Sequence, residues 1–85
     1  MNPENEVPGD AGELEGRYAN CFQVGHNAFE FVLDFGQYFP ERQVVGLHTR
    51  IITHPIYAKV LLDLLQGSVA RYEQTFGAIP REPGV

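Results

Sequence analysis

The chain has 85 residues, a formal net charge of −5 and 17 charged side chains, of which only six are Lys or Arg. This length allows one small domain, and the absence of a basic stripe argues against binding to DNA or RNA. No stretch is long and apolar enough to span a bilayer, and the N-terminus lacks the order of a signal peptide, so we expect a cytoplasmic protein with no membrane partner.

The N-terminal half of the sequence predicts a flexible arm followed by a β-hairpin. Residues 1–16 are acidic and poor in apolar side chains, which predicts a disordered arm. Alternation of apolar residues predicts one strand at 17–24 and a second from Ala28 to Phe35, with a possible extension to Phe39. Gly25-His26-Asn27 supplies turn residues between them, and Gly36 indicates a bulge or bend.

The C-terminal half predicts a third strand and one long helix. The strand is expected at 44–53, after a break at Pro40. Thr53 is predicted to cap the helix, Pro55 fits its first turn, and the helix should run to Phe76 and end at Gly77. Residues 80–85 form a short flexible tail in this interpretation.

The predicted fold class is therefore α+β, with a three-stranded antiparallel sheet followed by one C-terminal helix (β-β-β-α) in a single domain over residues 17–79. One face of the second strand is strongly apolar and should lie under the helix as the core. Its members are Phe29, Phe31, Leu33 and Phe35.

The helix has more apolar surface than one small sheet can cover. Leu62, Val69 and Phe76 widen its apolar arc beyond the face directed at the sheet. Exposed apolar area and two open sheet edges favour aggregation unless a partner covers them. We therefore expect a homodimer, while coverage by a different protein is the alternative.

A polar cluster is predicted on the other face of the sheet. Glu30 and Asp34 share a face of the second strand, opposite His48 and Arg50 of the third, and cross-strand ion pairing is the expected role. Acid–base catalysis by the two carboxylates is the alternative. The three histidines do not have the spacing of metal ligands, so no metal site and no cofactor are predicted.

Several short motifs together resemble the DUF3467 family of small bacterial and archaeal proteins of unknown function. They include Tyr18-Ala19-Asn20, Val24-Gly25-His26-Asn27, the stretch Glu30 to Gln37, His48-Thr49-Arg50-Ile51-Ile52 and Tyr57-Ala58-Lys59. The resemblance supports a single domain, supplies no catalytic residues, and implies an accessory protein more readily than an enzyme.

The leading functional hypothesis is a non-enzymatic adaptor that binds a larger cytoplasmic signalling, polarity or regulatory protein. A regulatory subunit that stimulates a small GTPase or another nucleotide-dependent enzyme, for example as part of an exchange factor, is a second hypothesis. An enzyme that uses the polar cluster is a third. The candidate interaction surface comprises Glu30, Asp34, His48, Arg50, Leu62, Val69 and Phe76.

Overall fold

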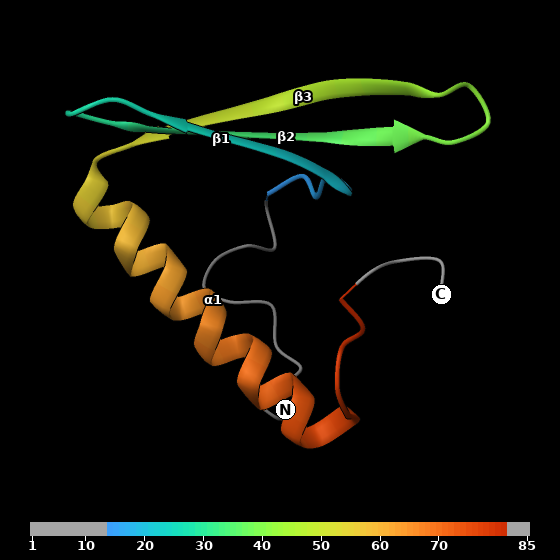
Figure 1. The fold of residues 1–85 in the computed structure, drawn as a ribbon, viewed down its shortest axis with the longest axis vertical. Coiled ribbons are helices and arrows are strands. Elements are labelled where there is room, and N and C mark those ends of the chain that lie inside the picture. Colours follow the sequence, from blue (N-terminus) through green and yellow to red (C-terminus); the bar gives the residue numbers. More distant parts are fainter. Residues whose placement is uncertain (1–13, 82–85) are drawn as a thin grey trace.

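The computed structural model describes residues 14–81, and these form three strands and one helix in the predicted β-β-β-α order (Figure 1). The elements are β1 (Cys21–His26), β2 (Phe31–Phe39), β3 (Val44–Thr53) and α1 (Pro55–Phe76). The strands make one antiparallel sheet in the order β1-β2-β3, which confirms the predicted fold class. Most of the predicted arm (1–16) and of the predicted tail (80–85) lies outside the described residues.

The β1–β2 hairpin turns later in the sequence than predicted. Gly25 and His26 still belong to β1, and the turn is built around Asn27. The Asn27 Oδ1 accepts hydrogen bonds from the backbone N–H groups of Phe29 (2.8 Å) and Glu30 (3.0 Å), which organises the next residues as a turn. As a result β2 begins at Phe31, and Phe29 is 80% exposed instead of forming part of a core.

The chain before β1 is held to the sheet mainly through side chains rather than a regular ladder. Asn20 Oδ1 accepts from the Tyr38 N–H (2.7 Å), and Arg17 donates to the His48 carbonyl (3.2 Å). The Tyr18 carbonyl can only accept, so His48 Nε2 is the donor in the 3.0 Å contact between them. The Asn20 N–H also donates to the Gly36 carbonyl (2.9 Å), and β1 starts at the next residue, Cys21, instead of at residue 17.

A β-bulge lies at the position where the sequence suggested one. Phe35 pairs with Thr49 and Gly36 pairs with Leu47, which leaves His48 as the extra residue of β3. Gly36 is buried, and a Cβ atom there would lie 2.8 Å from Leu47 Cα. The close approach of the two backbones therefore requires glycine.

Both ends of α1 agree with the predicted bounds, but a different residue caps its start. Thr53 is still paired with Phe31 in the sheet, and His54 is the N-cap, with its Nδ1 accepting from the Ile56 N–H (3.1 Å). Pro55 opens the helix, as expected. At the other end Gly77 has a φ of 100° and donates its N–H to the Glu73 carbonyl (3.0 Å).

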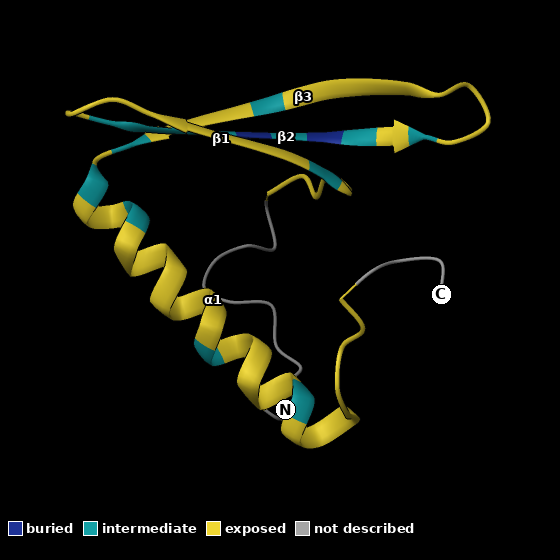
Figure 2. Cartoon of the chain, viewed as in Figure 1, coloured by how far each residue is buried: buried dark blue, intermediate teal, exposed yellow. Residues whose placement is uncertain are grey.

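The helix does not cover the sheet, which overturns the expected core. After its first turn α1 runs away from the sheet (Figure 1), and Figure 2 shows its surface exposed along almost its whole length. His54 alone separates β3 from α1, so the connection is too short to fold the helix back across the strands. Among residues 14–81 no apolar residue is buried; Phe31, Leu33 and Phe35 are only half-buried, while Asp34 and Gly36 are buried.

Candidate functional site

The two sides of the sheet carry different chemistry, and the polar side is built around one ion pair. Asp34 and Arg50 are direct partners across β2 and β3. Arg50 Nε donates to Asp34 Oδ1 (2.7 Å) and Arg50 Nη2 donates to Oδ2 (2.8 Å). This is a bidentate contact, the strongest geometry for an arginine–carboxylate pair. The Asp34 side chain is 9% exposed and that of Arg50 is 65% exposed.

The pair determines the charge state of the Asp34 carboxyl group. The hydrogen bonds from Arg50, helped by its positive charge, lower the pKa of Asp34 below its ordinary value of 3.8, and the partial burial of the carboxyl opposes this only in part. The same contact raises the pKa of Arg50. Asp34 is thus an ionised acceptor whose two oxygens are both occupied by Arg50, and this arrangement suits a structural role.

Asp34→Asn should lower the melting temperature by a few degrees at neutral pH, because the neutral amide cannot reproduce two charge-assisted hydrogen bonds. A carboxyl whose pKa is lowered by folding stabilises the fold above its ordinary pKa, and this contribution is lost as the pH falls through the lower, folded value. The difference between variant and wild type should therefore shrink below pH 3.8. Thermal melts at several pH values test this.

The matched control for this test is Glu30→Gln, the same chemical change outside the ion pair. It should leave the melting temperature nearly unchanged at neutral pH. Equal losses of stability for Asp34→Asn and Glu30→Gln would show that the ion pair has no special role in the fold.

The predicted polar cluster of four residues is brought together only in part. Asp34 and Arg50 meet as expected, but Glu30 belongs to the turn before β2. His48 is the bulge residue, and its ring contacts Thr49 Oγ1 (2.7 Å) and the Tyr18 carbonyl rather than a carboxylate. The sequence indicates a bulge or bend at Gly36, but it does not show that His48 is the extra residue of β3.

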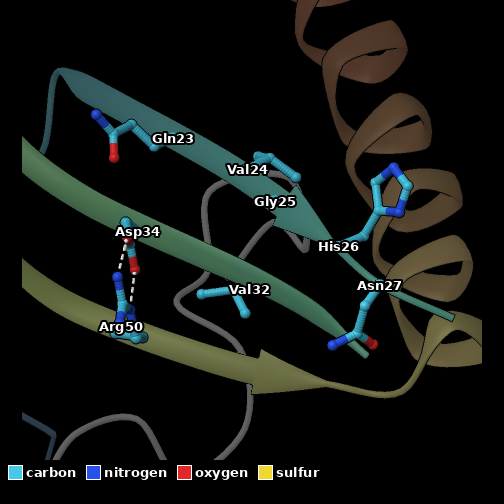
Figure 3. A pocket seen from close by; sticks show the side chains of 8 residues that line it. All are labelled: Gln23, Val24, Gly25, His26, Asn27, Val32, Asp34 and Arg50. Atoms are coloured by element: carbon cyan, nitrogen blue, oxygen red, sulfur yellow. Dashed lines mark hydrogen bonds and ion pairs between the residues drawn. The ribbon is translucent and has the colours of Figure 1, made fainter. Parts of the chain in front are cut away.

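An open groove of about 640 Å³, here called the outer groove, runs along the polar side of the sheet (Figure 3). Its lining combines amide, imidazole and aliphatic groups with the ion pair: Gln23, Val24, Gly25, His26, Asn27, Val32, Asp34 and Arg50. A smaller hollow of about 310 Å³ lies on the other side of the ion pair, next to His48. The Asp34–Arg50 pair therefore separates two shallow depressions of mixed polarity.

A second cavity lies in the angle between the sheet and α1, and it is almost entirely apolar. This sheet–helix cavity has a volume of about 590 Å³. The sheet and the first half of the helix line it together, through Val24, Phe31, Leu33, Pro55, Ala58, Lys59, Leu61, Leu62 and Leu65. The sequence indicated excess apolar surface on the helix, but the cavity depends on the angle between two elements, which no local pattern encodes.

The predicted interaction residues of the helix extend from this cavity toward the C-terminus. Leu62 and Val69 line a further groove of about 350 Å³ on the helix, together with Leu65, Gln66, Ala70 and Glu73. Phe76 is 58% exposed, and its ring lies 4.9 Å from that of Tyr72, centroid to centroid. Apolar surface is thus continuous from the sheet to the last turn of α1.

Residues 14–81 contain neither a candidate metal site nor a helix that could cross a membrane. In that range His, Cys, Asp and Glu side chains do not gather in groups of three or more as a metal site would require. The helix of the described region falls short of the length and hydropathy needed to cross a membrane.

Comparison with known proteins identifies the family. No significant match was found among curated proteins or among solved structures. A family model described as "Protein of unknown function (DUF3467)" matches residues 3–81. Since this match covers nearly the whole chain, the protein belongs to the DUF3467 family.

Proposed function

We propose that this chain is a non-enzymatic protein–protein interaction module, a cytoplasmic homodimer that acts as an adaptor for a larger signalling, polarity or regulatory protein. The observation that carries the proposal is the exposure of α1. Ten large apolar residues of this helix are at least 38% exposed, and none of its residues is buried. Such a surface in water is typical of a protein that meets another protein there.

The helix also needs a partner for its own stability. Helices of this length in water obtain most of their stability from packing an apolar face, and none of the residues of α1 is buried in the described part of the chain. Leu61, Leu62 and Leu65 are each about half exposed or more. An interaction that covers them stabilises the helix by about 25 cal/mol for each Å² of apolar surface removed from water.

The outer face of the sheet is the candidate surface for the larger protein. Ile52, which is 58% exposed, pairs with Val32 across β2 and β3, so both lie on the face of Asp34 and Arg50. Apolar side chains around a rigid bidentate ion pair form a patch of mixed polarity, as in the contact surfaces of non-obligate complexes. The patch is independent of the apolar helix face, so both surfaces can be occupied together.

Affinity capture from the cell that makes this protein tests the proposal. The wild-type chain should recover one larger protein in a stoichiometric amount, and Ile52→Glu should abolish the recovery because it places a charge in the apolar part of the patch. Val44→Glu is the matched control, because Val44 is a similar residue of the same strand and is 51% exposed, but it pairs with Phe39 at the other end of the strand, away from the Val32–Ile52 pair. Absence of a stoichiometric partner, or equal capture by the Ile52→Glu variant, would contradict the proposal.

A further inference from the structure

The apolar surface of α1 contains a regular stripe. Six residues follow one another at alternating steps of four and three, namely Ala58, Leu62, Leu65, Val69, Tyr72 and Phe76. This is the a/d spacing of a coiled coil, and here it is called the heptad stripe. The sheet–helix cavity and the helix groove both open onto it, since Leu62 and Leu65 line both. The stripe is thus one continuous surface.

Three polar residues flank the heptad stripe along one edge at intervals of seven. Lys59 lines the sheet–helix cavity, and Gln66 and Glu73 line the helix groove. The edge therefore carries a positive charge near the sheet, a neutral amide in the middle and a negative charge near the helix end. Glu73 is fixed at its place because its Oε2 accepts from the Ile79 N–H (2.8 Å).

We propose that a second copy of this chain covers the heptad stripe, with the two α1 helices antiparallel about a two-fold axis. This inference rests on the proposed role as an interaction module and names the occupant of the helix. With the axis near the middle of α1, Ala58 meets Phe76 of the second copy, Leu62 meets its Tyr72, and Leu65 meets its Val69. The smallest stripe residue then faces a large aromatic one at each end, as close packing requires.

The charges of the flanking edge favour this arrangement. Reversing one helix brings the same edge of both helices together. Lys59 then lies beside Glu73 of the second copy, and Gln66 lies beside the second Gln66. The two-fold axis repeats the Lys59–Glu73 pair, so two attractive contacts form. In a parallel pair this edge would instead face the opposite edge of the neighbour, where the equivalent positions are Leu61, Ser68 and Thr75.

The antiparallel pair also fills the sheet–helix cavity. The end of one helix lies at the start of the other, so Tyr72 and Phe76 of the second copy reach Ala58 and the sheet residues Val24 and Leu33 that line the cavity. The Tyr72–Phe76 aromatic pair is already formed in the single chain. The β3–α1 connection is too short for the helix to cover the sheet of its own chain. In the dimer, the helix of the second copy supplies this apolar cover.

The exposed apolar area of the stripe supplies a large part of a dimer interface. Five large apolar residues of the heptad stripe are exposed, namely Leu62, Leu65, Val69, Tyr72 and Phe76. At roughly 100 Å² each they provide on the order of 500 Å² of the about 800 Å² that each partner buries in a standard interface, and the exposed sheet residue Val24, which lines the cavity, adds to it. A second copy presents a surface that is matched to this one in length, residue size and charge order. This complementarity favours self-association over an unrelated partner.

The first measurement is the mass of the purified full chain by light scattering at micromolar concentration, where twice 9.5 kDa is expected.

The second experiment exchanges the charges at positions 59 and 73 and measures the Kd of the dimer. Lys59→Glu or Glu73→Lys alone should weaken the dimer by about tenfold in Kd at low salt, because two contacts become repulsive. The double variant Lys59→Glu/Glu73→Lys should restore the affinity. It lacks the native contact of Glu73 with Ile79, so restoration must come from the contact between copies.

The matched controls make the same changes of charge at helix positions outside the flanking edge of Lys59, Gln66 and Glu73. Arg71→Glu and Asp63→Lys are the controls for Lys59→Glu and Glu73→Lys, and both should leave the Kd within about twofold. A monomer of 9.5 kDa at micromolar concentration would overturn the inference, and so would a double variant no tighter than the single ones. A dimer that captures no larger protein contradicts only the adaptor function. A monomer that captures a larger protein contradicts the antiparallel dimer, and with it the homodimer part of the proposed function, but supports the adaptor role.

Discussion

Leu65→Asp is expected to leave α1 largely unfolded and the chain monomeric. Leu65 lines both the sheet–helix cavity and the helix groove, at the centre of the heptad stripe. In the antiparallel dimer it is enclosed between apolar side chains, and a carboxylate there would have no partner. The cost is more than about 3 kcal/mol per protomer. Helical circular dichroism and light scattering over a range of protein concentrations measure the two losses.

Leu64→Asp is the matched control for this prediction. Leu64 is adjacent and 67% exposed, compared with 59% for Leu65, but it lines neither the cavity nor the helix groove. In an isolated chain the two substitutions would have similar, small effects because the two side chains are similarly exposed. In the proposed dimer only Leu65 is enclosed, so equal melting curves for the two variants would contradict it.

Gly36→Ala is expected to have the second largest effect, through the sheet itself. The added Cβ would meet the Gly46 carbonyl oxygen and lie 2.8 Å from Leu47 Cα and 2.9 Å from Leu47 Cδ2. Two of these neighbours are backbone atoms of the adjacent strand, so the bulge must open to accommodate the methyl group. Overpacking of this kind costs about 1–3 kcal/mol, and against backbone we expect the upper end.

Gly46→Ala is the control, since Gly46 lies in the neighbouring strand and a Cβ there would meet nothing within 4 Å. Its melting temperature should stay close to that of the wild type, and that of the Gly36→Ala variant should fall by roughly 4–8 °C for each kcal/mol lost. If urea unfolding gave the same midpoint for both variants, the close approach at Gly36 would not govern the stability of the sheet.

Elements with strong local signals at both ends could be predicted from the sequence. The bounds of β3 and α1 agree with the prediction because Pro40, Pro55 and Gly77 act through backbone chemistry that does not depend on distant residues. The β1–β2 turn was misplaced because Gly25-His26-Asn27 matches hairpin chemistry, whereas the Asn27 side chain organises the residues after it. The cap was misassigned for a similar reason: both Thr53 and His54 can accept a hydrogen bond, and pairing of Thr53 in the sheet decides between them.

The same distinction between local patterns and tertiary structure applies to the candidate site. The Asp34–Arg50 pair was predictable because alternation along two strands places both side chains on one face. The place of Glu30 in the turn and the contacts of His48 with Thr49 and Tyr18 were not predictable, because they depend on where the turn ends and on which residue the bulge leaves unpaired. The heptad stripe is present in the sequence, but its spacing becomes significant only when the helix is known to stand apart from its own sheet.

The sequence by itself determined the order of the elements, the ends of the helix, the glycine at the bulge and the excess of apolar surface on α1. These follow from backbone restrictions and side-chain periodicity, which act over a few residues. Only the tertiary structure decided that α1 leaves the sheet, and with it the location of the apolar cavity and the absence of buried apolar residues within 14–81. The reason is the connection at His54. Only one residue separates β3 from α1, and the helix leaves the sheet at an angle, so the apolar residues of the two elements line an open cavity instead of packing against each other.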